Sequence, residues 1–490
     1  MITVKNVSFR YQNSEEFNVR KANLKIKEGE CVLLSGKSGC GKTTLLRLMN
    51  GLIPHFYGGE IEGQVRINGM NIMETPMYKI AEVVGTVYQN PKSQFFNVDT
   101  DGEILFGIEN LSYPREELIR RMNLAVEKTK TEKLLGRNIF ELSGGEKQKI
   151  AFASVFAMEP QVYLLDEPSA NLDAEATKEL RERIAELKKS GKTIVITEHR
   201  LYYLKGLVDR VVSLESGKIV KDSKAADFFR MEEPDRLSAG LRALHLNHIT
   251  LQNQVKQQQV VLEVKKVAAG YKKKKTIKDI SFLAAKGEVI GISGKNGAGK
   301  STLVETICGL NKIMEGTVTY KGNRLSEKQR CNISYMVFQD VDYQLFADSV
   351  EKECTYGTGN IAAESVRRIL DQLNLLEFSK QHPATLSGGQ KQRLAVAVGM
   401  LEQKKIIIFD EPTSGLDLDS MLRVTELVKM LAREGKIIFI VTHDYEFISA
   451  IGNRMLVMEE GTIIDDFFIC DQNKNKLADM FIKREVESIE

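Results

Sequence analysis

GKSGCGKT at residues 36–43 and GKNGAGKS at residues 294–301 are two copies of one pattern, Gly-x-x-x-x-Gly-Lys-Ser/Thr. Its glycines let successive backbone N–H groups turn inward around phosphate oxygens, and the helix that follows directs its positive end at them. An apolar stretch precedes each copy, at residues 31–34 and 289–292, and indicates the buried strand that the pattern requires. The sequence therefore predicts two phosphate-binding loops, each between a strand and a helix.

The residues of the two loops are expected to have different roles in nucleotide binding. Lys42 and Lys300 would neutralise the outer phosphates, and the hydroxyls of Thr43 and Ser301 would bind Mg²⁺. The predicted cofactors are therefore ATP and Mg²⁺. The other loop residues expected at the nucleotide are Gly36, Ser38, Gly39, Gly41, Thr44, Gly294, Asn296, Gly297, Gly299 and Thr302.

Downstream of each loop, an apolar strand ends in two acidic residues. Such a strand places its carboxylates at its tip, beside the phosphates. Asp166 and Asp410 are expected to hold Mg²⁺, whereas Glu167 and Glu411 are expected to polarise the attacking water as general bases. The two strands with their acids are VYLLDEP at residues 162–168 and IIIFDEP at residues 406–412.

A histidine follows each of these glutamates at the same spacing, His199 in the first half and His443 in the second. A neutral imidazole at the end of a strand can contact the γ-phosphate and fix the water, although a lone histidine is more often structural. The equal spacing favours a role in the site. The histidines without such a counterpart are His55, His245, His248 and His382.

LSGGE at residues 142–146 and LSGGQ at residues 386–390 complete the recurring set. In each, a serine and two glycines open a helix, so the hydroxyl and the backbone N–H groups can bind an anion. From these serines to the histidines, matching positions of the two halves are separated by one constant offset. The chain is therefore predicted to be an internal duplication.

Length and composition agree with two soluble domains. The 490 residues are too many for one ordinary core, and we predict a first domain at residues 1–225, a connector at 226–260 and a second domain at 261–490 with a C-terminal helical tail. The 69 basic and 66 acidic side chains give no reason to expect nucleic acid. We also expect neither a membrane-spanning segment nor a signal peptide. Six scattered cysteines without C-x-x-C spacing argue against zinc and disulfides.

The order of phosphate loop, glutamine, LSGG, Asp-Glu and histidine resembles that of the ATP-binding cassette (ABC) ATPases, and two copies cover nearly the whole chain. The resemblance implies an α/β fold with two tandem P-loop NTPase domains of the RecA-like type. Each domain would carry an antiparallel β subdomain and a helical signature subdomain. The two cassettes would pack head to tail as an internal pseudo-dimer, with each ATP between one half's phosphate loop and the other half's LSGG.

The same resemblance implies which residues share a site. Tyr11 and Tyr271 match the aromatic residue that stacks on adenine, with a core tyrosine as the alternative. Because neither half lacks the glutamate or the serine, both sites are expected to hydrolyse ATP. Gln89 and Gln339 are expected at both the nucleotide and Mg²⁺. The first site would comprise Lys42, Gln89, Asp166, Glu167 and His199 with Ser387, Gly388 and Gly389, and the second Lys300, Gln339, Asp410, Glu411 and His443 with Ser143, Gly144 and Gly145.

The segment after each glutamine suggests which kind of transporter the ATPase drives, because in this family it faces the membrane partner. VYQNPKSQFFNVDTDGEILFGIEN at residues 87–110 is similar to the energy-coupling-factor (ECF) transporters, which take up vitamins and metals. IPHFYGGEIEG, DEPSANLD and EHRLYYL are similar to the subgroup with two fused ATPases. This resemblance implies a peripheral protein on the cytoplasmic face of the cell membrane. Its partners would be an integral membrane scaffold subunit and small substrate-binding membrane subunits, and its cargo a vitamin, a vitamin precursor or a metal ion.

Two questions stay open in the sequence. The acids of this segment either receive arginines from the scaffold or occupy the first turn of a helix, where the helix dipole favours them. Alternative functions are the ATPase of another ABC importer and a soluble twin-cassette ATPase that works on ribosomes. The long charged helical linker of the latter class is missing from the sequence. The acids in question are Asp99, Asp101, Glu103, Asp348, Glu351 and Glu353.

Overall fold

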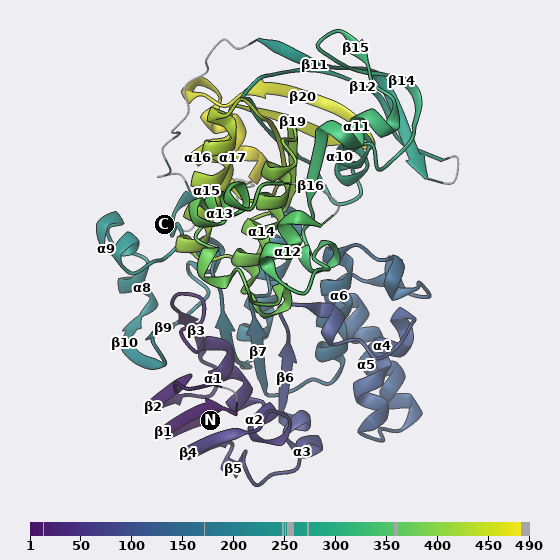
Figure 1. The fold of residues 1–490 in the computed structure, drawn as a ribbon. Coiled ribbons are helices and arrows are strands. Elements are labelled where there is room, and N and C mark those ends of the chain that lie inside the picture. Colours follow the sequence, from purple (N-terminus) through teal and green to yellow (C-terminus); the bar gives the residue numbers. More distant parts are fainter. Residues whose placement is uncertain are drawn as a thin grey trace. The chain divides into compact units, whose positions relative to one another are not determined.

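The computed structural model describes the chain except for residues 13, 171, 247, 248, 250, 252–258, 272, 273, 357–360 and 482–490. The chain divides into two compact units, with the boundary between His245 and Leu246. Each unit is α/β (Figure 1), which confirms the predicted fold class of two tandem domains. No helix of the described residues is long and apolar enough to cross a membrane.

Unit one contains an antiparallel sheet of order β2-β1-β4-β5 and a six-stranded sheet of order β10-β9-β3-β8-β7-β6. In the larger sheet only β10 is antiparallel to its neighbour. Its central strands are buried on both faces, as their continuous apolar sequences require. The strands are β1 (Ile2–Tyr11), β2 (Val19–Ile26), β3 (Cys31–Ser35), β4 (Gly59–Ile67), β5 (Met70–Asn71), β6 (Val84–Val87), β7 (Val162–Asp166), β8 (Thr193–Thr197), β9 (Arg210–Glu215) and β10 (Lys218–Lys224).

Helices cover both faces of the larger sheet and form a separate helical part. Leu45 and Leu48 of the helix after the phosphate loop pack between the two sheets. Leu180 and Ile184 cover the opposite face of the larger sheet. The helices are α1 (Lys42–Met49), α2 (Leu52–His55), α3 (Met77–Val83), α4 (Thr100–Asn110), α5 (Arg115–Thr129), α6 (Gly144–Ala157), α7 (Ala174–Lys189), α8 (Ala225–Phe228) and α9 (Glu233–Ser238).

Unit two repeats this architecture, with sheets of order β12-β11-β14-β15 and β20-β19-β13-β18-β17-β16. Its strands are β11 (Val260–Tyr271), β12 (Lys274–Ala285), β13 (Val289–Ser293), β14 (Ile313–Tyr320), β15 (Asn323–Arg324), β16 (Ser334–Val337), β17 (Ile406–Asp410), β18 (Ile437–Val441), β19 (Arg454–Glu459) and β20 (Thr462–Phe468). Its helices are α10 (Lys300–Cys308), α11 (Glu327–Ile333), α12 (Val350–Thr355), α13 (Ala363–Gln372), α14 (Gly388–Leu401), α15 (Leu418–Arg433), α16 (Tyr445–Ile451) and α17 (Lys474–Phe481).

The two units end differently. In unit one, Phe228 and Leu244 are buried in the same core as α7, so the first part of the predicted connector 226–260 belongs to this unit. The later connector residues 247, 248, 250 and 252–258 lie outside the described residues. In unit two, Leu477 and Phe481 of α17 are buried, which agrees with a packing helix. Residues 482–490 of the predicted tail lie outside the described residues.

Candidate functional site

The phosphate loops adopt backbone conformations that require glycine. Gly36 has φ 145° and Gly41 has φ 105°, a region that side-chain-bearing residues rarely adopt. A Cβ on Gly36 would lie 2.3 Å from the carbonyl oxygen of Leu214, and one on Gly41 would lie 2.4 Å from that of Asn18. The loop therefore ends in a tight turn at Gly41, and α1 begins at Lys42.

Both loop lysines are buried and bonded inside their own loops. Lys42 Nζ donates to the carbonyl oxygens of Gly36 (2.7 Å) and Lys37 (2.9 Å). Lys300 Nζ donates to those of Gly294 (2.7 Å) and Lys295 (3.1 Å). Each ammonium group is thus fixed where the backbone curves around it, the position from which it can meet the charge of a phosphate.

Thr43 and Asp166 meet at the tip of the parallel sheet in unit one. Thr43 Oγ1 donates to Asp166 Oδ1 (3.2 Å), and Thr197 Oγ1 donates to the same oxygen (2.5 Å). Burial raises the pKa of Asp166, the charge of Glu167 adds to this rise, and the two hydroxyls oppose it. A hydroxyl and a buried carboxylate in contact are oxygen ligands of the kind that Mg²⁺ prefers.

The equivalent acid of unit two has different surroundings. Asp410 pairs in the sheet with Val441, whereas Asp166 pairs with Thr197. Burial raises the pKa of Asp410 to about 6, with Lys300 lowering it and Glu305 raising it. The two predicted magnesium acids therefore occupy the same position in the fold but differ in their neighbours.

Glu167 lies at the centre of a polar cluster. Gln89 Nε2 donates to Glu167 Oε2 (2.6 Å), and His199 Nε2 lies 3.3 Å from Glu167 Oε1. In unit two the corresponding distance between His443 Nε2 and Glu411 Oε1 is 3.5 Å. The predicted base and histidine are therefore adjacent in both units.

The glutamates themselves are held in a strained conformation. Glu167 has φ 46° and Glu411 has φ 49°, and left-handed conformations of residues other than glycine cost about 1–3 kcal/mol. Each receives support from the neighbouring strand, because the Glu167 N–H bonds the carbonyl of Thr197 and the Glu411 N–H that of Val441. The same conformation thus recurs at the predicted base of both units.

These groups fit a nucleotide with Mg²⁺. The Nε2 atom of His199 is buried and makes no hydrogen bond among the described residues, although it lies 3.3 Å from Glu167 Oε1, so its hydrogen-bonding capacity can serve a phosphate. Thr43 with Asp166 would hold the metal and Lys42 would meet the phosphates. Bound Mg²⁺ would supply positive charge where the phosphate oxygens accumulate negative charge.

Different residues position the two histidines. Glu198 and Tyr203 of unit one were not predicted from the sequence. In unit one, the buried Glu198 accepts the N–H of His199 (2.8 Å) and the hydroxyl of Tyr203 (2.8 Å). In unit two, Glu411 itself accepts the N–H of His443 (3.3 Å). The phrase EHRLYYL contains both Glu198 and Tyr203, but their contact depends on the turn that follows β8.

Each LSGG serine begins a helix, as predicted. Ser143 caps α6 and Ser387 caps α14, each in a capping box with the residue three positions later. Three of the four glycines after these serines are not required for packing within their units, because a Cβ on Gly144, Gly388 or Gly389 would meet nothing within 4 Å. The pairing of each turn with the opposite half's phosphate loop stays a prediction.

The predicted adenine residues end the first strand of each unit. Arg47 Nη1 donates to the hydroxyl of Tyr11 (2.9 Å), and the Tyr11 and Tyr57 rings lie edge to face at 6.1 Å. In unit two, the hydroxyl of Tyr271 donates to Glu305 instead. Tyr271 is 51% exposed and therefore is not a core residue.

The acids after the glutamines are mostly used within the protein. The buried Glu103 accepts the N–H groups of Phe96 (2.9 Å) and Asn97 (2.8 Å). Glu353 repeats this arrangement with Phe346 and Ala347. Asp99 caps α4, Asp101 accepts the N–H of Gly136, Asp348 pairs with Lys352, and Glu351 pairs with Lys380. These contacts favour the interpretation that the acids stabilise the structure of their own unit.

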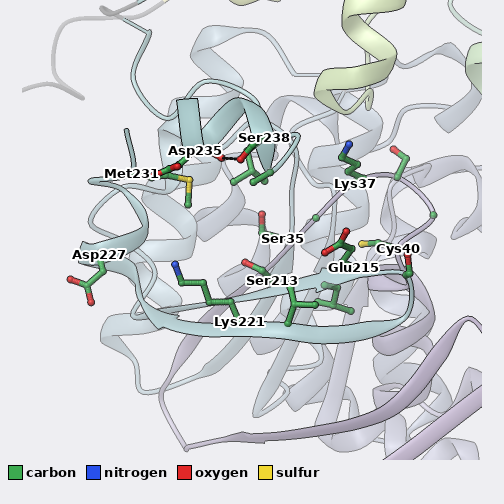
Figure 2. Close-up of a pocket in the computed structure, with 18 of the residues that line it drawn as sticks. Ser35, Lys37, Cys40, Ser213, Glu215, Lys221, Asp227, Met231, Asp235 and Ser238 are labelled. Carbon is green, nitrogen blue, oxygen red and sulfur yellow. Dashed lines mark hydrogen bonds between the residues drawn. The ribbon is translucent and has the colours of Figure 1, made fainter. Parts of the chain in front are cut away.

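A cavity of about 790 Å³ lies beside the phosphate loop of unit one, between β9 and the α8–α9 segment. Figure 2 shows Ser35 and Lys37 at one side of it and Asp235 and Ser238 at another. A Cβ on Gly240 would lie 2.4 Å from Cε of Lys37, so the chain after α9 lies against the loop. The predicted connector 226–260 includes this segment, and the sequence gives no sign that it contacts the phosphate loop.

Comparisons with known proteins agree with this geometry. The family model described as ABC transporter matches residues 19–170 and 277–414. A protein of Treponema denticola named "Putative ABC transporter ATP-binding protein" is 46% identical over 484 residues, covering 97% of this chain and 99% of the relative. A protein of Methanosarcina mazei with the same name is 35% identical over 476 residues, covering 95% of each chain.

Among solved structures, one described as a model of ribosome-bound archaeal Pelota and ABCE1 has a TM-score of 0.68. It is 20% identical and covers 94% of this chain and 78% of that chain. At this identity the likeness shows the fold alone.

Proposed function

We propose that this chain, which belongs to the ABC transporter family, is the ATP-hydrolysing subunit of a membrane transporter of the energy-coupling-factor type. It has two ABC ATPase domains, and each carries a phosphate loop, an Asp-Glu pair and a histidine in contact or at the same place in the fold. Its cargo would be a vitamin, a vitamin precursor or a metal ion. The chain would lie on the cytoplasmic face of the membrane.

The observation that carries this proposal is the loop after each glutamine. Phe96 is 75% exposed and Phe346 is 69% exposed, although both are large apolar residues. Their backbone N–H groups are fixed by the buried carboxylates of Glu103 and Glu353. A rigid loop that presents an aromatic side chain at the same place in both units is suited to docking a partner protein.

The same loop can transmit a displacement to the reaction centre. Gln89 precedes the loop and donates directly to Glu167, the predicted base. A shallow apolar groove of about 290 Å³, lined by Phe96, Phe106 and Met158, lies beside the loop in unit one. A membrane scaffold bound there would be mechanically connected to the site of hydrolysis through one side chain.

In the proposed reaction, the protein groups act on ATP held at a head-to-tail interface of the two units. Lys42 and Lys300 bind the phosphates, and Asp166 and Asp410 hold Mg²⁺ with the neighbouring hydroxyls. Glu167 and Glu411 orient the attacking water and accept its proton, and the histidines fix the γ-phosphate. The set Ser143, Gly144, Gly145, Ser387, Gly388 and Gly389 would close the sites from the opposite unit.

The test is affinity isolation of the tagged chain from detergent-solubilised membranes of its host, followed by mass spectrometry. We expect one scaffold-like membrane protein and small hydrophobic binding proteins, and the ligand of the latter would identify the cargo. The variant Phe96→Asp with Phe346→Asp should lose these partners and still bind ATP. Ile464→Asp, which changes another exposed apolar residue, is the matched control. Recovery of ribosomes, or of no membrane protein, would overturn the proposal.

A further inference from the structure

The helical part of unit one has an apolar core of its own. Ile108 of α4 and Val126 of α5 are buried in one cluster with Ile150 of α6. Another face of α6 contributes Phe152 to a second cluster, which contains Leu180 of α7 and the strands of the larger sheet. The two clusters share no buried residue in the described part of the chain, and α4 and α5 lie side by side next to α6 (Figure 1). The helices α4 and α5 are therefore a separate lobe, which rests on α6.

Polar contacts join this lobe to α7. The buried Arg183 of α7 donates from Nη2 to the carbonyl oxygen of Thr129 at the end of α5 (2.6 Å) and to Glu179 on its own helix (3.2 Å). Exposed ion pairs contribute little to such a contact, so the bond from Arg183 is the main connection between α7 and the lobe. The ion pairs around it are Lys128 with Glu186 (3.9 Å) and Lys130 with Glu182 (3.7 Å).

Unit two has leucines at both positions of this bond. Thr129 and Leu373 each precede a residue in the left-handed conformation that ends α5 or α13, with φ 53° and 52°. Arg183 and Leu427 occupy the same position along α7 and α15. Leu373 and Leu427 are buried in one cluster that also contains Ile407 of β17. The helical part and the sheet of unit two therefore share a continuous apolar core.

The shallow groove beside the loop that carries Phe96 lies on the boundary between the lobe and the rest of unit one. Leu52 and Met77 line it from the side of the sheets, whereas Phe106 and Gly107 line it from α4. A molecule bound in this groove would contact both sides of the boundary. A change in the position of the lobe would consequently change the shape of the groove.

We propose that the lobe of unit one opens and closes against α7 by pivoting on α6, with Arg183 as the latch, whereas the corresponding helices of unit two stay fixed to their core. When the lobe separates from α7, water replaces the lost partners of the Arg183 guanidinium and the Thr129 carbonyl, so no polar group remains unsatisfied. The same separation in unit two would expose Leu373 and Leu427 to water, which is unfavourable in proportion to the apolar area exposed. This inference depends on the packing within each unit and not on the transport role.

The test compares the accessibility of equivalent buried positions in the full-length chain, through the variants Thr129→Cys and Leu373→Cys. N-ethylmaleimide modifies a buried thiol only after an opening, and mass spectrometry of the peptides measures each position separately. Modification at position 129 should be at least about tenfold faster than at position 373. Cys31, which is buried in the second cluster of unit one, is the internal standard for global unfolding and should stay unmodified during this time. Equal rates at the two positions, or modification of Cys31 as fast as that of position 129, would refute the proposal.

Removal of the latch then assigns the opening to Arg183. Adding Arg183→Ala to the Thr129→Cys variant should speed modification at position 129 about tenfold, because a hydrogen bond from a charged group is lost. Arg181→Ala is the matched control, since Arg181 lies on the same helix but donates to the carbonyl oxygens of Tyr203 and Lys205 and not to α5. It should leave the rate unchanged. An unchanged rate with Arg183→Ala, or an equal increase with Arg181→Ala, would overturn the proposal.

Discussion

Single side chains give Asp166 and Asp410 different properties at the ends of equivalent strands. The carboxylate of Asp166 accepts hydrogen bonds from two hydroxyls. Asp410 instead pairs in the sheet with Val441, and its pKa is raised to about 6. The folded chain therefore binds a proton at Asp410 more tightly than the unfolded chain, whose aspartates titrate near 3.8. Between these two pKa values the contribution of Asp410 to stability falls as pH rises. Above pH 6 the carboxylate is charged in the folded chain, and its burial destabilises the fold by the full amount.

The variant Asp410→Asn should consequently stabilise the protein in the absence of Mg²⁺ and nucleotide at pH 7. We expect a gain of about 1–3 kcal/mol in the free energy of unfolding, because the neutral amide removes a buried charge of similar shape. Urea unfolding with a chelator present measures it, and the gain should vanish near pH 4. Asp166→Asn is the matched control and should gain less, since two hydroxyls already stabilise its charge. A gain at pH 4 as large as that at pH 7 would contradict the assigned pKa shift.

At the same scale, the sequence identifies some site residues and not others for a physical reason. Lys42, Asp166 and Glu167 follow from local patterns, because a loop or strand end fixes where such side chains point. Glu198 and Tyr203 could not be predicted in this way, since they meet only after the chain turns beyond β8. Their contact is a property of tertiary structure and not of spacing.

Among the secondary-structure elements, the segment that follows each glutamine depends on one buried carboxylate. Glu103 accepts two backbone N–H groups ahead of α4, and Glu353 does so ahead of α12. A buried carboxylate in this position organises the loop more than it attracts a partner's arginine. The exposed Phe96 and Phe346 are therefore the better candidates for contact with a membrane scaffold.

Replacement of Glu103 by alanine should loosen this loop without unfolding the unit. Two N–H groups lose a charged acceptor, and a hydrogen bond to a charged group contributes about 1.5–3 kcal/mol. Hydrogen exchange read by mass spectrometry should show faster exchange at Phe96 and Asn97, with β7 unchanged. Asp101→Ala, which removes an acid of the same segment, should not affect these two amides. Unchanged hydrogen exchange at these amides in Glu103→Ala would contradict the role of Glu103 in fixing the loop.

The sequence predicts the elements well where a pattern is periodic or local. The strands before the loops, the helices that begin at Lys42 and Lys300, and the capping serines all lie where the sequence indicates. The segment of α8 and α9 differs, because its short helices are held by Phe228 and Leu244 in the core of unit one. Charged residues interrupt the apolar ones in this segment, so the sequence does not show that its apolar residues join the core of unit one.

At the scale of the whole molecule, the duplication confirmed by the fold raises the question of how the two halves act together. Equivalent sheets, phosphate loops and strained glutamates recur in both units. The sequence predicted the two domains and their family. The head-to-tail arrangement stays a prediction, as do the membrane partners, because local patterns do not specify how separate units or separate chains associate.

The most direct test of two complete hydrolytic halves is steady-state phosphate release by the purified chain and by Glu167→Gln, Glu411→Gln and the double variant. We predict a lower rate in each single variant, and a rate at least about 100-fold lower in the double variant, which should still bind ATP. Undiminished phosphate release in the double variant would contradict the assignment of Glu167 and Glu411 as the general bases.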